Sequence, residues 1–312
     1  MKQSPIDPFL KKQGSLILDG GLATELEARG YNLSDSLWSA RLLADAPQAI
    51  KEVHLDYLEA GADCIISASY QATIQGFLSK GFTENESVTL LQRSVLLAQE
   101  ARDEFWSNPA NREHRLRPLV AAGVGPYGAY LADGSEYRGN YALDEEALVD
   151  FHRRRWQLLV DCAPDLMACE TIPSIVEASV LQRLLVETPG ISAWFSFCCQ
   201  DGRHIGDGTP LVDCIAPLDR VPQVVAVGIN CTAPRFIREL VREARCATQK
   251  PIIVYPNSGE TYDAEGKRWI GHSIPEDFAE QSRSWRLAGA TLLGGCCRTG
   301  PKHIRQLRAA TF

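Results

Sequence analysis

Long hydrophobic runs are missing from this sequence, and so is an excess of positive charge. No apolar stretch approaches the roughly 18 residues that a membrane-spanning helix needs, and the segment from Met1 to Pro8 lacks the apolar core of a signal peptide. Lys and Arg number 32 against 39 Asp and Glu, and the resulting net charge of −7 repels nucleic-acid phosphates. We therefore expect a cytoplasmic protein that binds neither membranes nor nucleic acids.

Several catalytic patterns are absent as well. The first apolar run is followed by Asp19-Gly20-Gly21-Leu22-Ala23-Thr24, which is not the G-x-G-x-x-G of a dinucleotide fold. None of the six histidines stands at a metal-binding spacing from another, and no Ser/His/Asp motif occurs. The basic run from His152 to Arg155 has no interleaved aromatic residues, so we expect it to form a solvated helix face.

Short apolar runs alternate with helical patterns along the whole chain. Residues 50–58, 88–105 and 175–185 each place apolar side chains on one helix face, and Gly61 and Gly289 suit the left-handed ends of two helices. The apolar runs are residues 16–18, 64–66, 119–122, 166–169, 191–197, 224–227, 252–255 and 292–293.

Eight continuous apolar strands separated by helices indicate a parallel sheet covered on both faces. The sequence therefore predicts an α/β fold, a single (β/α)8 barrel, with a doubly wound open sheet as the alternative. No linker divides the chain, so we expect one domain over residues 1–312, with residues 1–12 as an N-terminal lead-in.

Cysteine is abundant, with ten residues in the chain. In a protein without an export signal, clustered cysteines more often bind metal or act in catalysis than form a disulfide framework. Residues 228–231 read Gly-Ile-Asn-Cys after the sixth strand, and residues 294–297 read Gly-Gly-Cys-Cys after the eighth. These strands flank the seventh strand of a barrel, so Cys231, Cys296 and Cys297 can converge at its mouth, where barrel active sites lie.

Three thiolates and one open position are the ligand count of a catalytic zinc ion, so we predict one Zn²⁺ at these three cysteines. The preceding glycines leave room for the chain to bend and turn adjacent residues toward one ion. We expect isolated cysteines to pack as small buried hydrophobic residues, namely Cys64, Cys162, Cys169, Cys214 and Cys246. The pair Cys198-Cys199 is a competing metal site, but no glycine precedes it.

Together with residues 19–27, which read Asp-Gly-Gly-Leu-Ala-Thr-Glu-Leu-Glu, the two cysteine motifs resemble the zinc-dependent homocysteine S-methyltransferases. The resemblance covers essentially the whole chain. Residues 35–40, 69–73, 125–139 and 255–260 resemble the branch that uses S-methylmethionine. The sequence ends 15 residues after Cys297 and is therefore expected to lack the C-terminal arm of the betaine branch and the extra domains of the cobalamin enzyme.

The resemblance implies a thiolate mechanism in which homocysteine sulfur occupies the open zinc position and attacks the methyl carbon of a sulfonium donor. It makes Glu170 the candidate for binding the substrate ammonium, with Asp19 as a second candidate that could instead brace the following turn. The amides of Gly20, Gly21 and Leu22 could bind the substrate carboxylate at a helix start. Asn230 is expected to orient the site rather than bind metal.

Aromatic faces attract cations, so loop aromatics are candidates for binding the sulfonium donor. Trp38 is the first candidate, and Tyr127 is another, with Tyr70 and Tyr130 on the same set of loops. Packing is the competing role for each of them.

The leading interpretation is a methyltransferase that takes homocysteine and S-methylmethionine or S-adenosylmethionine to methionine. A betaine-dependent homocysteine methyltransferase and a non-catalytic zinc-binding or thiol-binding barrel are the alternatives. The oligomeric state is open, and a monomer is compatible with the sequence.

Overall fold

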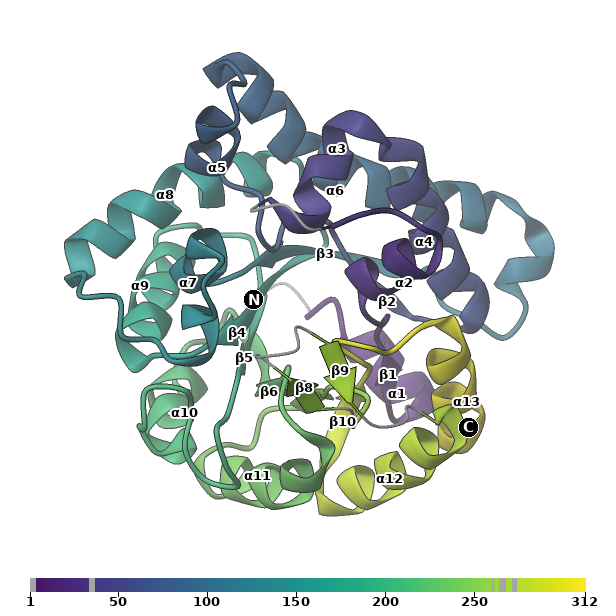
Figure 1. Ribbon diagram of the computed structural model, residues 1–312. Coiled ribbons are helices and arrows are strands. Elements are labelled where there is room, and N and C mark those ends of the chain that lie inside the picture. Colours follow the sequence, from purple (N-terminus) through teal and green to yellow (C-terminus); the bar gives the residue numbers. More distant parts are fainter. Residues whose placement is uncertain (1–3, 34–36, 260, 264–267, 271–273) are drawn as a thin grey trace.

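Eight parallel strands form a barrel with helices around it (Figure 1). The computed structural model describes residues 4–33, 37–259, 261–263, 268–270 and 274–312. The strands are β1 (Leu16–Ile17), β2 (Cys64–Ile66), β3 (Leu119–Val124), β4 (Leu166–Ile172), β5 (Ala193–Phe197), β6 (Val224–Asn230), β7 (Ile252–Tyr255) and β10 (Ala290–Leu293). Each predicted apolar run forms one of them.

The strand order around the barrel is β1-β10-β7-β6-β5-β4-β3-β2, and all pairings are parallel. A parallel bridge between Leu18 and Cys64 joins the first and last strands of this order. The Asp63 amide adds a hydrogen bond of 2.7 Å to the Ile17 carbonyl across the same seam. The predicted barrel is confirmed, and the open-sheet alternative is wrong.

The longer helices form the outer ring (Figure 1). They are α4 (Pro47–Ala60), α6 (Glu84–Ser107), α8 (Glu145–Asp161), α9 (Ile175–Val186), α10 (Leu211–Asp219), α11 (Pro234–Ala247), α12 (Pro275–Ala288) and α13 (Pro301–Thr311). Gly61 and Gly289 end α4 and α12 with φ of 111° and 119°, as their sequence context predicts. None of the described helices has the length and apolar character to cross a bilayer.

Shorter elements occupy the connections. They are α2 (Leu22–Ala28), η1 (Trp38–Arg41), α3 (Leu42–Asp45), α5 (Ile74–Ser79), η2 (Pro109–Arg112), α7 (Tyr127–Leu131) and η3 (Ser135–Tyr137). An antiparallel hairpin of β8 (Thr261–Asp263) and β9 (Arg268–Ile270) lies between β7 and α12. No sequence pattern indicates this pair of strands, because strands of three residues carry too little periodicity to be recognised.

The N-terminal segment expected to be a lead-in contains helix α1 (Asp7–Gln13). Ile6 and Phe9 belong to the same buried cluster as the inward-facing side chains of the strands, including Leu16 and Trp194. Because Gln13 also contacts Asp63, directly before β2, α1 covers the amino ends of the strands. The opposite, carboxyl ends remain available for a site.

The basic run on α8 departs from the prediction of a solvated face. His152 and Arg155 are buried, and only Arg153 and Arg154 lie at the surface. Positions three residues apart share one helix face, and this face packs against the barrel. The Arg155 guanidinium donates hydrogen bonds to the carbonyls of Ser69, Tyr70 and Gly125 at 2.6 to 3.0 Å, so it ties together the chain ends that leave β2 and β3.

Candidate active site at the carboxyl ends of the strands

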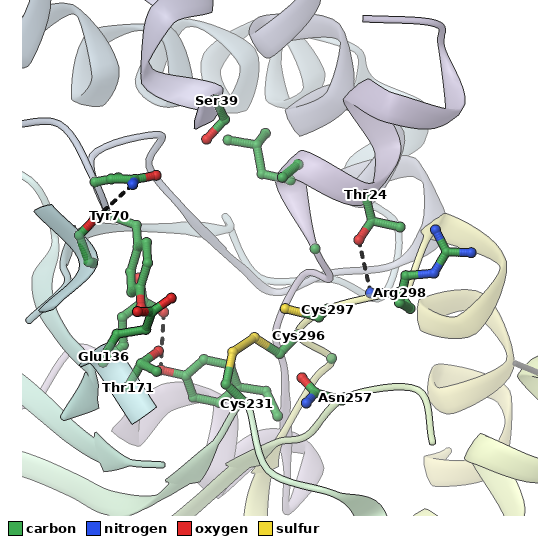
Figure 2. A pocket seen from close by; sticks show the side chains of 18 of the residues that line it. Thr24, Ser39, Tyr70, Glu136, Thr171, Cys231, Asn257, Cys296, Cys297 and Arg298 are labelled. Carbon is green, nitrogen blue, oxygen red and sulfur yellow. Dashed lines mark hydrogen bonds between the residues drawn. A yellow bond between two sulfur atoms is a disulfide. The ribbon is translucent and has the colours of Figure 1, made fainter. Parts of the chain in front are cut away.

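A cavity of about 1080 Å³ opens at the carboxyl ends of the strands (Figure 2). Its lining comes from the carboxyl ends of β2, β4 and β7 and from the connections after β1, β2, β3, β6, β7 and β10. This is the position of the active site in barrel enzymes, and the volume is at the upper end of the roughly 300–1,000 Å³ typical of small-molecule sites. The cavity therefore has room for more than one small substrate.

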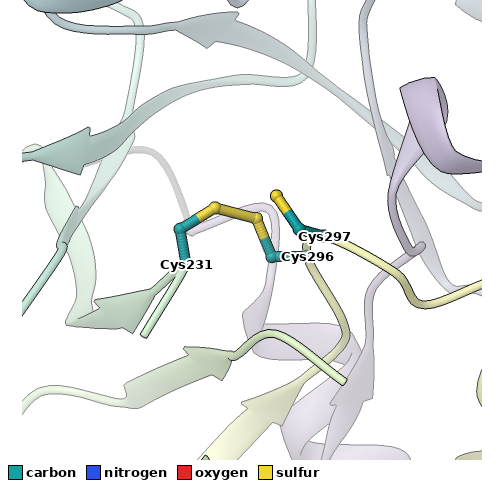
Figure 3. A group of neighbouring side chains, drawn as sticks. All are labelled: Cys231, Cys296 and Cys297. Atoms are coloured by element: carbon teal, nitrogen blue, oxygen red, sulfur yellow. A yellow bond between two sulfur atoms is a disulfide. The ribbon is translucent and has the colours of Figure 1, made fainter. Parts of the chain in front are cut away.

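Three cysteines meet at this cavity (Figure 3). The sulfur atoms of Cys231, Cys296 and Cys297 all lie within 4.8 Å of one another, and no other group of this kind occurs among the described residues. Cys231 and Cys296 form a disulfide, whereas Cys297 carries a free thiol. The cysteines that follow β6 and β10 therefore converge as expected. Two of the three sulfur atoms are in the oxidised state.

The backbone conformation of Cys231 and the tight packing of the loop around Cys296 hold these cysteines at the cavity. Cys231 has φ of 45°, a left-handed conformation that turns the chain directly after β6. The amide of Cys296 donates to the Pro256 carbonyl at 2.8 Å, which fixes the loop after β10 against the end of β7. A Cβ atom on Gly21 would lie 2.6 Å from the Cys296 carbonyl, so only glycine fits there.

Two buried carboxyl groups form another part of the cavity wall. Asp19 is 4% exposed and accepts a hydrogen bond of 2.8 Å from the Ile66 amide. Glu170 is 7% exposed and accepts one of 3.3 Å from the Tyr255 hydroxyl. Within the described part of the chain, neither carboxyl group forms a salt bridge with a basic side chain.

Burial controls the protonation of both carboxyl groups. Burial raises the pKa of Glu170 to about 8, against the smaller opposing effects of the Tyr255 hydrogen bond and the Arg155 charge. Burial also raises the pKa of Asp19 well above its usual range, and the nearby Glu170 adds to this rise. Two acidic groups that lack cationic partners form a site suited to a cationic ligand.

The glycine-rich turn and Asn230 also take up defined positions. Gly20 and Gly21 line the cavity at the start of α2. The Gly21 amide donates to the Thr299 carbonyl at 2.9 Å, so this amide is already engaged and the prediction that it binds a substrate carboxylate loses support. The Asn230 side chain is fully buried and bonded to Thr171, which agrees with an orienting role.

The predicted donor-binding aromatics occupy different places. Tyr127 packs among Tyr130, Tyr141 and Phe151, with ring centroids 4.9 to 5.7 Å apart, and lies outside the cavity lining. Trp38 begins η1, but its side chain lies outside the described residues.

Among the residues that the structure describes, the aromatic ones that line the cavity are Tyr70, Tyr137 and Tyr255. Burial raises the pKa of the Cys297 thiol to about 11, and the neighbouring Tyr137 side chain opposes this rise; Glu136 lies beside Tyr137 in the lining. Sequence reasoning did not single out Tyr137 or Glu136, although both lie in the segment 125–139 that carried part of the family resemblance.

The remaining cysteines lie outside the thiol cluster. Cys198 is buried, with its sulfur 3.2 Å from the Glu136 carbonyl oxygen, and Cys199 is half-buried. Cys64, Cys169 and Cys214 are buried as expected, and Cys162 is half-buried. The expectation was wrong for Cys246, which is exposed on α11 and donates to the Arg242 carbonyl one turn earlier.

The fold and the site together define a (β/α)8 barrel of the kind found in many enzymes, with a cluster of cysteine sulfurs and two buried carboxyl groups at its mouth. The chain belongs to the homocysteine S-methyltransferase family, whose model matches residues 16–311.

Close relatives support this assignment. The chain is 52% identical to homocysteine S-methyltransferase YbgG of Bacillus subtilis over 306 residues, which cover 98% of this chain and 97% of that protein. It is 50% identical to homocysteine S-methyltransferase of Escherichia coli over 309 residues, 99% of each chain. Crystal structures of the homocysteine methyltransferase MmuM from Escherichia coli, described as oxidized and metallated forms, superpose with TM-scores of 0.89 and 0.87. Both are 48% identical and cover 98% of this chain and 99% of theirs.

Proposed function

We propose that this protein transfers a methyl group from a sulfonium donor to homocysteine and so forms methionine. S-methylmethionine is the proposed donor, with S-adenosylmethionine as the alternative sulfonium. One observation carries the proposal: a cluster of three cysteine sulfurs and two buried, unpaired carboxyl groups share a single cavity. Homocysteine presents a thiol and an ammonium group at its two ends, which match these two features.

The donor set fits a zinc ion. Cys231, Cys296 and Cys297 would hold it as thiolates once the disulfide between Cys231 and Cys296 is reduced, because a disulfide offers no thiolate ligand. When bound, zinc supplies an open coordination position and favours the thiolate form of a substrate thiol at neutral pH. A cytoplasmic location, which keeps thiols reduced, belongs to this proposal.

The amino-acid end of homocysteine is assigned to Asp19 and Glu170. An ammonium group placed between them provides the positive charge that these buried carboxylates lack. Gly20, at the start of α2, lines the same part of the cavity and is the remaining glycine candidate for contact with the substrate carboxylate.

The donor is assigned to the side of the cavity formed by Tyr70, Glu136 and Tyr137. Aromatic faces attract a sulfonium ion, and a carboxylate adds to that attraction. One carboxyl oxygen of Glu136 is buried without a hydrogen-bond partner, so it can accept from the donor's ammonium group. Trp38 stays a prediction, and the packing of Tyr127 favours a supporting role for it.

The reaction itself is a substitution at carbon. The thiolate sulfur forms a bond to the methyl carbon, the bond between that carbon and the sulfonium sulfur breaks, and the electron pair stays on the departing sulfur. A negative and a positive charge disappear together, which a desolvated cavity favours. With S-methylmethionine as donor, both products are methionine.

A donor comparison tests the proposal. Reduced, zinc-loaded protein is given homocysteine with S-methylmethionine, S-adenosylmethionine or betaine, and methionine formation is followed. We expect turnover with the sulfonium donors and the highest kcat/KM with S-methylmethionine. Turnover with betaine alone would support the betaine-dependent alternative, and no turnover with any donor would leave the non-catalytic zinc-binding or thiol-binding barrel.

The organisation of the chain completes the proposal. We infer that residues 1–312 act as one homocysteine-binding barrel domain, with α1 covering the end opposite the cavity. A monomer stays the expected active unit.

A further inference from the structure

Strand β4 contains an irregularity at the residue that carries the proposed ammonium contact. In its pairing with β5, Cys169 lies opposite Phe195 and Ile172 lies opposite Phe197. Two residues of β4, Glu170 and Thr171, therefore oppose a single residue of β5, which is the arrangement of a β-bulge.

The bulge changes which side chains reach the cavity. In a regular strand, adjacent side chains point to opposite faces, so Glu170 and Thr171 would diverge. Here both line the cavity. The next side chain, Ile172, points the other way and packs in the hydrophobic core between the strands and the helices. The extra residue at the end of β4 thus leaves Glu170 on the cavity side and adds Thr171 beside it.

Thr171 adopts a costly backbone conformation to make this bulge. Its φ is 58°, and among the seven described non-glycine residues with positive φ it is the one with a branched Cβ. A left-handed conformation is unfavourable for such a residue and persists only where its surroundings impose it.

Asn230 imposes the conformation through two reciprocal hydrogen bonds. The Thr171 amide donates to the Asn230 side-chain oxygen at 2.7 Å, and the Asn230 side-chain nitrogen donates to the Thr171 hydroxyl oxygen at 2.7 Å. Thr171 and Asn230 are 1% and 0% exposed, so water does not replace either bond. Asn230 directly precedes Cys231. The hydrogen bonds between Asn230 and Thr171 therefore connect β4 to the sulfur cluster.

Thr171 also reaches the donor side of the cavity. Thr171 and Tyr70 both line the cavity, and the Thr171 side chain acts as a hydrogen-bonding neighbour of the Tyr70 phenol that partly opposes the rise in its pKa caused by burial. The Tyr70 backbone is in turn fixed by Arg155, whose guanidinium donates to its carbonyl at 2.6 Å. One side chain thus connects the proposed ammonium contact, the sulfur cluster and the proposed donor side.

We propose that Thr171 is a positioning residue: clamped by Asn230 in a left-handed bulge, it aims Glu170 at the substrate ammonium and sets the separation between Glu170 and the sulfur cluster. This inference rests on the proposed function. It assigns no contact with the reacting atoms to Thr171, so loss of the clamp impairs binding of the amino-acid end more than the methyl-transfer step.

The test compares Thr171→Val, which keeps the shape but removes the hydroxyl, with Thr171→Ser, which keeps the hydroxyl. In reduced, zinc-loaded protein we expect Thr171→Val to raise KM for homocysteine about tenfold, with kcat changed less than about threefold. Thr171→Ser restores KM to within about twofold. Calorimetric titration with methionine, which has the same amino-acid end and no thiol, reports the same tenfold loss without turnover.

Thr248→Val is the matched control. Thr248 is another buried threonine whose hydroxyl is hydrogen-bonded, to Asp219 and to the Lys250 amide, in the connection that leads into β7 at the end away from the cavity. It should leave the homocysteine KM and methionine affinity unchanged even where the thermal midpoint falls. Zinc content should stay at one ion per chain in every Thr171 variant.

Asn230→Ala removes both reciprocal hydrogen bonds, of which Thr171→Val removes one, and it covers the case in which Thr171→Val does not fold. It should reproduce the tenfold loss, and the double variant should be no weaker than the more impaired single variant. Unchanged methionine affinity in these variants, equal impairment by Thr171→Ser, or additive losses would each overturn the inference. A wild-type protein that neither binds methionine nor makes it from homocysteine would instead overturn the proposed function.

Discussion

Both ends of the barrel bury carboxyl groups, but among the described residues only the amino end supplies them with cationic partners. At the amino ends of the strands, the Asp63 side chain is 1% exposed and accepts hydrogen bonds from Gln13 at 2.7 Å and from the Ile17 amide at 3.1 Å. Arg308 donates to its other oxygen at 3.1 Å, and Arg115 lies 3.9 Å away. This carboxylate is fully paired.

At the mouth, Asp19 and Glu170 are buried to a similar degree but have one protein hydrogen bond each and no salt bridge within the described residues. A barrel enzyme can afford unpaired polar groups at this end because a ligand completes them. We infer that buried charge serves stability at the amino ends and ligand binding at the carboxyl ends. The following experiments test this division of roles.

The sulfur cluster should show the largest effect. Cys297→Ala removes one of three proposed ligands, so the reduced protein should lose stoichiometric zinc and essentially all methyltransferase activity, more than the roughly 10- to 100-fold that loss of an outer contact costs. Metal analysis and an initial-rate assay measure both. Cys198→Ala, at a nearby buried thiol outside the cluster, is the control and should keep both. Retention of one zinc per chain by Cys297→Ala would contradict the assigned ligand set.

Replacing one buried carboxyl group at each end by its neutral amide should separate effects on substrate binding from effects on folding stability. Glu170→Gln should raise KM for homocysteine about 30- to 100-fold, which corresponds to ~2–3 kcal/mol for a hydrogen bond to a charged group. Asp63→Asn leaves the half-buried Arg308 and Arg115 poorly paired and should lower the free energy of unfolding by about 3 kcal/mol while leaving KM unchanged. Denaturant unfolding and steady-state kinetics on both variants check this. The comparison fails if Asp63→Asn raises KM as much as Glu170→Gln.

The affinity for the amino-acid end should depend on pH. The pKa of Glu170 in the free protein is raised to about 8, and the ammonium group requires the carboxylate, so binding displaces a proton below that pH. Methionine affinity should therefore rise with pH between about 5.5 and 7.5, by up to about tenfold per unit. Calorimetry with methionine avoids the titration of a substrate thiol. Glu170→Gln should make the profile shallower and leave only the rise that comes from Asp19, whose pKa burial also raises; a flat wild-type profile would contradict the account.

The hydrogen bond from Tyr255 to Glu170 should have the smallest effect. The Tyr255 hydroxyl also lies 2.6 Å from the Ser196 hydroxyl and 3.2 Å from the Trp194 indole nitrogen, so it holds Glu170 from inside the barrel. Tyr255→Phe should raise KM for homocysteine about fivefold, near ~1 kcal/mol. Ser196→Ala removes a partner of Tyr255 without touching Glu170 and should change KM less. Equal increases in KM from Tyr255→Phe and Ser196→Ala would mean that the hydrogen bond from Tyr255 to Glu170 is not what matters, and that Tyr255 acts through its packing inside the barrel.

Much of this architecture could be predicted because it follows from local patterns in the sequence, above all the alternation of apolar runs with helical segments. Continuous apolar runs identified the barrel strands, and strand order alone brought Cys231 together with Cys296 and Cys297. The roles of Glu170 and Asp19 could be predicted only from the family resemblance, because the spacing of residues in the sequence does not indicate what a carboxyl group binds.

The remaining features depend on tertiary packing. The burial of His152 and Arg155 follows from the rotation of α8 against the barrel, which a basic run conceals. Tyr127 packs in an aromatic cluster because the neighbouring rings come from α8 and from the segment after η3. The left-handed Thr171 could not be predicted, since no glycine or asparagine marks the position and its conformation is imposed from β6.

The stability of Glu170→Gln as a function of pH tests the division between the two ends most directly. A folded-state pKa near 8, above the unfolded value of about 4.3, means that wild-type protein loses stability as pH rises through this interval. Substrate-free Glu170→Gln should therefore be at least as stable as wild type at pH 5, and its advantage should grow by about 1.4 kcal/mol per pH unit up to pH 8. A variant that is less stable than wild type throughout, as expected for Asp63→Asn, would show that Glu170 is a structural carboxylate and contradict the account.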